Sequence, residues 1–169
     1  ATLWILLGTV GLVLLIAVLA AVGAMGYAVA TPYQSAGTTS LYLVTENESG
    51  VGVASDYPTE FTAGDPQPLT VGIRNDGADS QPYTVVIVEE QVRPTGDEFA
   101  VSEANEIGRL HGVASPEETL TRTHSVDPQL VGEDIRLHYY LYRGESAPSN
   151  PDPSSAYRDV YIWIDVTES

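Results

Sequence analysis

The stretch PLTVGIRNDGADSQPYTVVIVEEQV, residues 68–92, decides the fold. In its first part Leu69, Val71 and Ile73 alternate with other residues, a pattern typical of a strand with one buried face. NDGAD predicts a hairpin turn, because Asn and Asp tolerate left-handed backbone and Gly adopts it at no steric cost. PYTVVIVEEQV is then expected to be the partner strand, and its apolar run Val85–Val88 indicates a central position.

The same alternation recurs on both sides of this stretch. Strands are predicted at TSLYLVTE, TLTRTHSV, IRLHYYLYRG and YRDVYIWIDV, separated by segments rich in Gly, Pro, Asn and Ser. Residues 97–113 leave two alternatives open: a short helical turn at Ser102–Ile107, or a loop that leads into a strand at Arg109–Val113. About seven short strands at these spacings predict an all-β, immunoglobulin-like sandwich.

An apolar segment precedes the strands. Residues 3–30 contain no charged residue and would form a helix of about 40 Å, longer than the roughly 30 Å hydrocarbon core of a bilayer. We therefore predict one transmembrane helix over residues 1–31, a polar spacer over 32–40 that Pro32 begins, and a β-sandwich over 41–169. A pilin-like filament helix stays open as an alternative.

The charge is concentrated in the remainder of the chain. The first 45 residues carry none of the 23 acidic and 7 basic residues, and the net charge is −16. All basic residues are Arg, and Lys is absent. Such an acidic domain repels itself unless salt screens it, which indicates a salt-loving microbe. It also argues against nucleic-acid binding, while the absence of Cys excludes disulfides.

The orientation of the predicted span is inferred from its flanks. No Lys or Arg follows it within 40 residues, which disfavours a cytoplasmic position for the C-terminal part. Asn47 begins the sequence NES, a candidate N-glycosylation site of the kind found on exposed surfaces. We therefore expect a cell-membrane protein with a single span in this chain and an extracellular C-terminal domain.

Residue patterns for catalysis or metal binding are weak. His111, His124 and His138 are interpreted as solvent-facing strand residues, although the first two could approach each other on neighbouring strands. Turn chemistry explains the carboxylates of NDGAD and SNPDP better than calcium does. Glu89 and Glu90 are adjacent and so point to opposite faces of a strand. We predict no enzyme, no cofactor and no metal site.

Aromatic residues gather on the last two predicted strands. If these strands pair, one face carries Tyr140, Tyr142, Tyr161 and Trp163. We name these four as a candidate interaction strip, exposed on the outside of the domain.

Several motifs in order resemble one family. LYLVTENESG, DYPTEFTAGDPQPLTVGIRNDG, GRLHGVASPEETLTRTHSV, IRLHYYLYRG and YRDVYIWIDV are together similar to archaeal membrane proteins of domain of unknown function family 1616. The resemblance covers nearly the whole chain, span included. Members often carry further membrane helices upstream, so the chain resembles the C-terminal part of such a protein. The resemblance implies an archaeal membrane protein with an external β domain, and no activity.

These observations lead to one expected function and two alternatives. We expect a membrane-anchored cell-surface module with a structural or interaction role and no catalysis. Its expected partners are the lipid bilayer, surface-layer or other envelope proteins, envelope glycans, or its own copies. The alternatives are an accessory domain of a multi-span protein that handles envelope glycans or lipids, and a pilin-like filament subunit.

Overall fold

The computed structural model describes residues 39–46, 52–53 and 57–169. The predicted transmembrane helix 1–31, nearly all of the spacer 32–40 and the candidate glycosylation site Asn47 lie outside these residues. The described part of the chain contains no helix with the length and apolar character that a membrane span requires.

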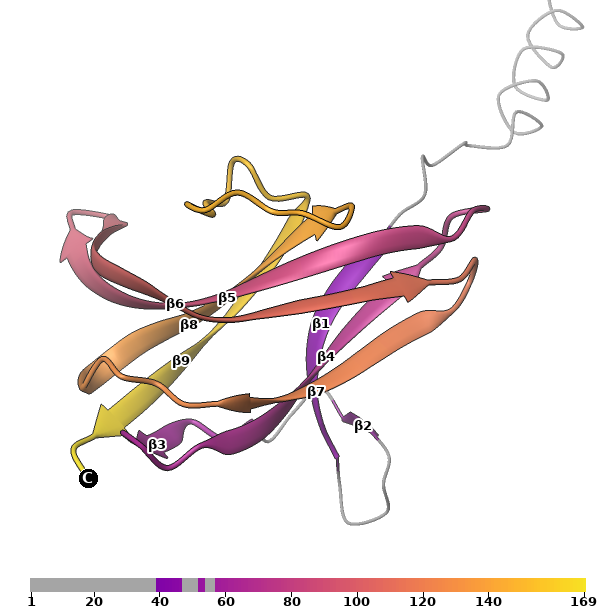
Figure 1. Cartoon of the computed structure of the whole chain (residues 1–169). Coiled ribbons are helices and arrows are strands. Elements are labelled where there is room, and N and C mark those ends of the chain that lie inside the picture. The colour runs from indigo at the N-terminus through magenta and orange to yellow at the C-terminus, as the bar shows by residue number, and fades with distance from the viewer. Residues whose placement is uncertain (1–38, 47–51, 54–56) are drawn as a thin grey trace, which may run out of the picture. The chain divides into compact units, whose positions relative to one another are not determined.

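The described residues form nine strands in two sheets (Figure 1). In chain order the strands are β1 (Thr39–Glu46), β2 (Gly52–Val53), β3 (Glu60–Thr62), β4 (Gln67–Asn75), β5 (Gln81–Thr95), β6 (Glu98–Ala114), β7 (Thr119–Val126), β8 (Gly132–Arg143) and β9 (Arg158–Thr167). One sheet has the order β2-β1-β4-β7 and the other β3-β9-β8-β5-β6. The predicted two-sheet, all-β sandwich is confirmed. Six of its seven longer strands match predicted strands, and the seventh, β6, lies where the sequence left two alternatives open.

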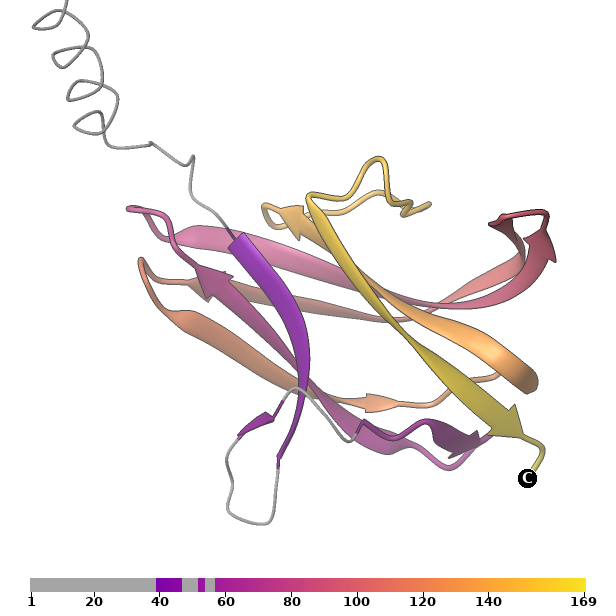
Figure 2. The same ribbon diagram turned by 180° about the vertical axis from the view of Figure 1, so that it is seen from behind.

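The inner faces of the two sheets form the core, as the alternation predicted. Leu69, Val71 and Ile73 on β4 pack with every second residue of β8, namely Ile135, Leu137, Tyr139 and Leu141. On β9, Ile164 and Val166 are buried in the same cluster. The two short strands were not predicted: β2 pairs with β1, and β3 runs parallel to the end of β9, as Figure 2 shows from behind.

The predicted hairpin between β4 and β5 is wrong. β4 pairs with β1 and β7, whereas β5 pairs with β6 and β8, so the turn after Asn75 carries the chain from one sheet to the other. The buried Asn75 explains this course. Its side-chain amide donates to the carbonyls of Asp79 and Ala114, at 2.8 and 3.1 Å, and so joins two connections that both cross between the sheets.

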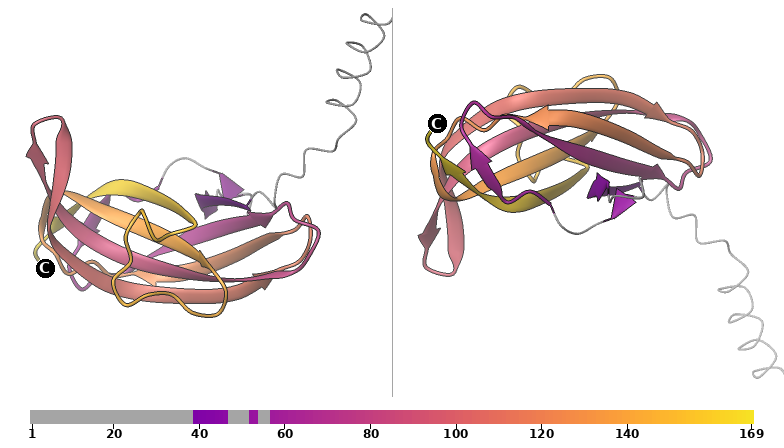
Figure 3. Two further views of the ribbon diagram at one scale, coloured as in Figure 1. Left: turned by 90° about the horizontal axis from the view of Figure 1, so that it is seen from above. Right: turned by 90° about the horizontal axis from the view of Figure 1, so that it is seen from below.

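The helical alternative at Ser102–Ile107 is also wrong, because β6 is one continuous strand. It forms the true hairpin with β5, and the register shows one extra residue on β6 at Ser102 and another at Ile107. Each bulge shifts the alternation of inward and outward side chains by one position. These shifts hide the strand pattern in the sequence. The turn end of this hairpin curls away from the sandwich (Figures 1 and 3).

Candidate functional site

The candidate site lies on the outer face of the five-stranded sheet, the face turned away from the core. The predicted interaction strip lies on this face, since β8 and β9 pair as expected. Its exposure, however, differs from the prediction. Tyr140 and Tyr142 are only 1% and 7% exposed, whereas Tyr161 is 47% exposed and Trp163 is half-buried. Two of the four residues are therefore unavailable to a partner in this conformation.

A loop over residues 144–157 buries the first two tyrosines. Its Ala147 and Ala156 pack on a small apolar cluster made by Val86, Val88, Tyr140 and Tyr142. We call this cluster, with the loop over it, the covered end of the outer face. The proline-rich sequence of the loop predicted a connection but not the surface on which it lies.

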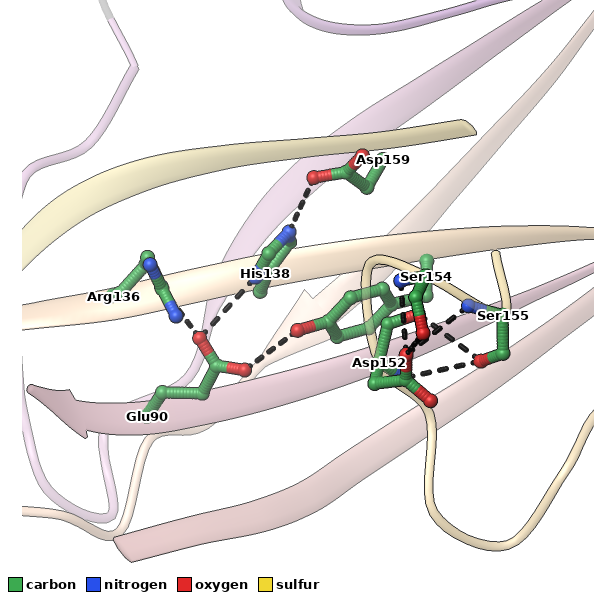
Figure 4. Close-up of polar contacts among 8 residues, drawn as sticks. Glu90, Arg136, His138, Asp152, Ser154, Ser155 and Asp159 are labelled. Atoms are coloured by element: carbon green, nitrogen blue, oxygen red, sulfur yellow. Dashed lines mark hydrogen bonds and ion pairs between the residues drawn. The ribbon is translucent and has the colours of Figure 1, made fainter. Parts of the chain in front are cut away.

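Several polar contacts hold the loop in place. The Arg109 guanidinium on β6 donates to the carbonyls of Ala147 and Pro148, at 3.2 and 3.0 Å. The hydroxyls of Tyr142 and Ser155 are hydrogen-bonded at 3.0 Å. Inside the loop, one carboxylate oxygen of Asp152 accepts from the backbone N–H groups of Ser154 and Ser155 (Figure 4). These contacts explain SNPDP as turn chemistry.

A buried carboxylate occupies the centre of the outer face. Glu90 on β5 is 4% exposed and accepts hydrogen bonds from three side chains of β8 (Figure 4). The donors are Arg136 at 2.5 Å, His138 at 3.2 Å and the Tyr140 hydroxyl at 2.7 Å. The other ring nitrogen of His138 lies 2.7 Å from Asp159 on β9. His138 can donate a hydrogen bond to both carboxylates only when each of its ring nitrogens carries a proton. The network ties three neighbouring strands together.

Burial and hydrogen bonding act in opposite directions on Glu90. Burial by itself would raise the pKa of the carboxyl group, because it disfavours the charged form. Hydrogen bonds from His138, Tyr140 and Arg136, together with the charge of His138, outweigh that effect and hold the pKa below its ordinary value. The group is therefore ionised at neutral pH, and burial and the bond to Glu90 raise the pKa of Tyr140.

The network contains residue types found in active sites, but its geometry favours a structural role. Each member contacts another member, and His138 stacks on Tyr140 with ring centroids 4.0 Å apart. A substrate would have to displace these contacts to reach His138, which is buried. Sequence reasoning missed the network. The available signal was a pair of carboxylates that ends the apolar run of a central strand.

The adjacent Glu89 points to the opposite face, as predicted. It is fully buried and accepts hydrogen bonds from the backbone N–H groups of Gln129 and Leu130, at 2.7 and 3.1 Å. It also accepts one from the Asn105 side chain at 3.3 Å. Glu89 thus fixes the segment between β7 and β8 to the sheet and does not act together with Glu90.

The three histidines occupy different environments. His111 is exposed, as predicted, whereas the prediction is wrong for the buried His138. The prediction also fails for His124, which is half-buried, with one ring nitrogen 3.0 Å from the hydroxyl of the buried Tyr139. Because β6 and β7 belong to different sheets, His111 and His124 are not on neighbouring strands.

An open aromatic group lies at the other end of the outer face. It consists of Phe99, Tyr161 and Trp163, which we call the aromatic corner. Phe99, at the turn end of the β5–β6 hairpin, is 59% exposed, and its ring centroid lies 5.6 Å from that of Trp163. The Tyr161 and Trp163 centroids lie 5.8 Å apart. Together with Val92, Pro94 and Asp134, these rings line a cavity of about 450 Å³.

Two bulges shape the aromatic corner. The extra residue Ser102 on β6 shifts the alternation of the strand by one position. As a result Phe99 lies opposite Pro94, and both side chains lie on the outer face. The register of β8 against β9 shows a second extra residue between Gly132 and Ile135. Asp134 in this second bulge has a positive φ of 55°. Sequence reasoning found Tyr161 and Trp163 but missed Phe99 and Asp134, because neither follows the simple alternation.

The fold and the site together define a β-sandwich domain whose outer sheet face has a covered end and an open end. A family model described as Domain of unknown function (DUF1616) matches residues 32–165. The chain therefore belongs to the DUF1616 family. A search of curated proteins found no match.

Two solved structures illustrate the similarity to other proteins. A β-glucosidase from Listeria innocua in complex with glucose has 12% identity and a TM-score of 0.46. The match covers 78% of this chain and 16% of the glucosidase. Spo0M, a sporulation control protein from Bacillus subtilis, has 12% identity and a TM-score of 0.41, with 78% of this chain and 49% of that one covered. This chain thus spans less than half the length of either protein.

Proposed function

We propose that this chain is a membrane-anchored module of the cell surface, whose β-sandwich contacts other envelope components without catalysis. The uncharged segment 1–31 would supply the anchor, and the acidic domain would lie outside the cell. We also propose an immunoglobulin-like class for the sandwich. The order β1-β4-β7 opposite β9-β8-β5-β6 supports that class.

The single observation that carries this proposal is the aromatic corner. Exposed aromatic side chains are enriched where proteins bind partners, and here two exposed rings and the half-buried Trp163 gather around one cavity of an acidic domain. The surrounding polar chemistry supports binding over catalysis. Glu90, His138 and Asp159 contact one another, and Arg136 and Tyr140 also donate to Glu90.

The test is photo-cross-linking in intact cells at their native salt concentration. A photoreactive phenylalanine at position 99 would report on the aromatic corner. The same residue at position 113 is the control, since Val113 is equally exposed but lies at the other end of the β5–β6 hairpin. We expect links from position 99 to surface-layer protein, another envelope component or a second copy. Equal capture from both positions, or none from position 99, contradicts the proposal.

We further propose that the protein comes from a salt-loving archaeon, on the basis of its charge. Twenty-three acidic residues without a single Lys repel one another, and molar salt screens this repulsion. The full chain should lose β structure, measured by circular dichroism, when salt is lowered from molar concentrations to about 0.1 M. An unchanged spectrum would refute this proposal.

A further inference from the structure

We propose that the aromatic corner binds a compact organic cation, an ammonium or guanidinium group, with Asp134 as its counter-charge. This inference rests on the proposed function, because it names the ligand class of the surface through which the module is proposed to act. It is carried by the angles between the rings and by the position of Asp134 at the same cavity.

The rings stand at steep angles to one another. The Phe99 and Trp163 ring planes meet at 56°, and those of Tyr161 and Trp163 at 77°. Rings arranged in this way form walls around a space, whereas coplanar rings form a flat platform. The face of an aromatic ring is electron-rich, so several faces around one space attract a cation. Indole has the strongest such attraction, and Trp163 lies in contact with both other rings.

The chain itself already places a cation on one of these rings. The Arg136 guanidinium carbon lies 5.4 Å from the centroid of Tyr161, within the range of a cation–π contact. Arg136 is also bonded to Glu90, so its charge is paired inside the network. The nearby Arg93 lies between Val92 and Pro94 on β5, and strand alternation turns it away from the face that these two residues line.

Asp134 places a negative charge at the cavity, and none of the other described residues that line the cavity is positively charged. Asp134 is exposed, and its backbone N–H donates to the Asp165 side chain at 3.0 Å, which holds the bulge in a left-handed conformation that Asp tolerates.

The test uses Trp163 as the reporter. The chain has two tryptophans, so Trp4→Phe leaves Trp163 as the single tryptophan in the full chain, and its emission is excited selectively over that of the ten tyrosines. The protein, solubilised in a polyoxyethylene detergent, is titrated with choline at constant total molar salt. The matched control ligand is 3,3-dimethylbutan-1-ol, which has the shape of choline but no charge. We expect a saturable change in fluorescence with choline and none with the neutral alcohol.

Variants then assign the effect to the site. Phe99→Leu keeps an apolar side chain but removes the ring, and should weaken choline binding by roughly tenfold. Asp134→Asn keeps the size and tolerates the positive φ, and should weaken it by about fivefold. Val113→Ala, at an exposed site at the other end of the hairpin, should leave it unchanged. Circular dichroism confirms that each variant is folded.

Further ligands show whether the cation comes from a small solute or lipid headgroup or from a protein partner, and they test the alternatives to cation binding. Tighter binding of choline than of N-acetylarginine amide indicates a methylated ammonium solute or lipid headgroup, and the reverse order indicates a side chain of a protein partner. An equal response to the neutral alcohol, a response to glucose alone, or full binding by Phe99→Leu overturns the inference. Capture from position 99 without cation binding would leave the proposed function intact and refute only the ligand class.

Discussion

The two ends of the outer sheet face carry similar aromatic side chains in opposite surroundings. At the covered end Tyr140 and Tyr142 are buried under the 144–157 loop, and at the open end Tyr161 and Trp163 border a cavity. Strand alternation places all four on one face and cannot distinguish them. A connecting loop, held by Arg109 and Ser155, therefore separates the aromatic residues that are buried in the fold from those that stay accessible.

The largest expected effect comes from the network between the two ends. Glu90→Ala leaves Arg136 and His138 without their shared carboxylate and should lower the free energy of unfolding by about 3–5 kcal/mol. Urea unfolding at constant molar salt measures this change. Glu106→Ala is the control, because its ion pair with Arg109 is solvent-exposed and should contribute less than about 1 kcal/mol. Equal losses of unfolding free energy in the two variants would show that the network stabilises the fold no more than an exposed ion pair does.

A smaller effect is expected from His124, between the two sheets. Burial lowers the pKa of His124 to about 4, from an ordinary value of 6.5, and its Nδ1 has no hydrogen-bond partner. Between these pH values His124 is protonated in the unfolded chain but stays neutral in the folded chain. Stability should therefore fall as pH is lowered from 6.5 to 4, by on the order of 2 kcal/mol.

His124→Gln should remove that part of the pH dependence, while His111→Gln, at an exposed site, should retain it. Urea unfolding at several pH values gives the slope of the unfolding free energy against pH for each variant. The Glu90 contribution lies at lower pH, because a depressed carboxyl pKa gives stability that is lost only below the ordinary value of about 4.5. Parallel slopes for the wild-type and His124→Gln chains would contradict the burial of a neutral histidine.

A still smaller effect on global stability, about 1 kcal/mol, is expected when the loop is loosened. Arg109→Leu removes the two hydrogen bonds to Ala147 and Pro148 at the covered end. Hydrogen–deuterium exchange should become faster in residues 144–157 and stay unchanged in β4. Arg74→Leu, which breaks an exposed pair with Asp76, serves as the control. Unchanged exchange in the loop would mean that its apolar contacts alone hold it.

The sequence predicted the strands better than the way in which they associate. Period-2 patterns located six of the seven longer strands, because burial of one face imposes the alternation directly, but they missed most of β6, where two bulges shift it. The crossing of the chain between the sheets after Asn75 is stabilised by its side chain, which bridges two connections that are distant in sequence. No local pattern records such a contact. The bulges at Ser102 and Asp134 likewise break the alternation from which the face of a residue is inferred.

The candidate site was only half predictable for the same reason. Tyr161 and Trp163 follow the alternation of β9 and were found, whereas Phe99 comes after a bulge on another strand and was not. The burial of Glu90 depends on three donors from β8, and these face it only once the register of β5 and β8 is known. Short-range patterns give the faces of single strands, but a site across strands needs the register.

One measurement tests the division of the outer face most directly: a comparison of Tyr142→Ala with Phe99→Ala, each assayed for unfolding free energy and for cross-linking in cells. The photoreactive residue for this assay is placed at position 101, beside the aromatic corner. We predict that Tyr142→Ala loses about 3 kcal/mol of stability, and that Phe99→Ala stays within about 0.5 kcal/mol of the wild type but loses its cross-linked partner. A Phe99→Ala chain that keeps its partner, or that unfolds as readily as Tyr142→Ala, would contradict the account.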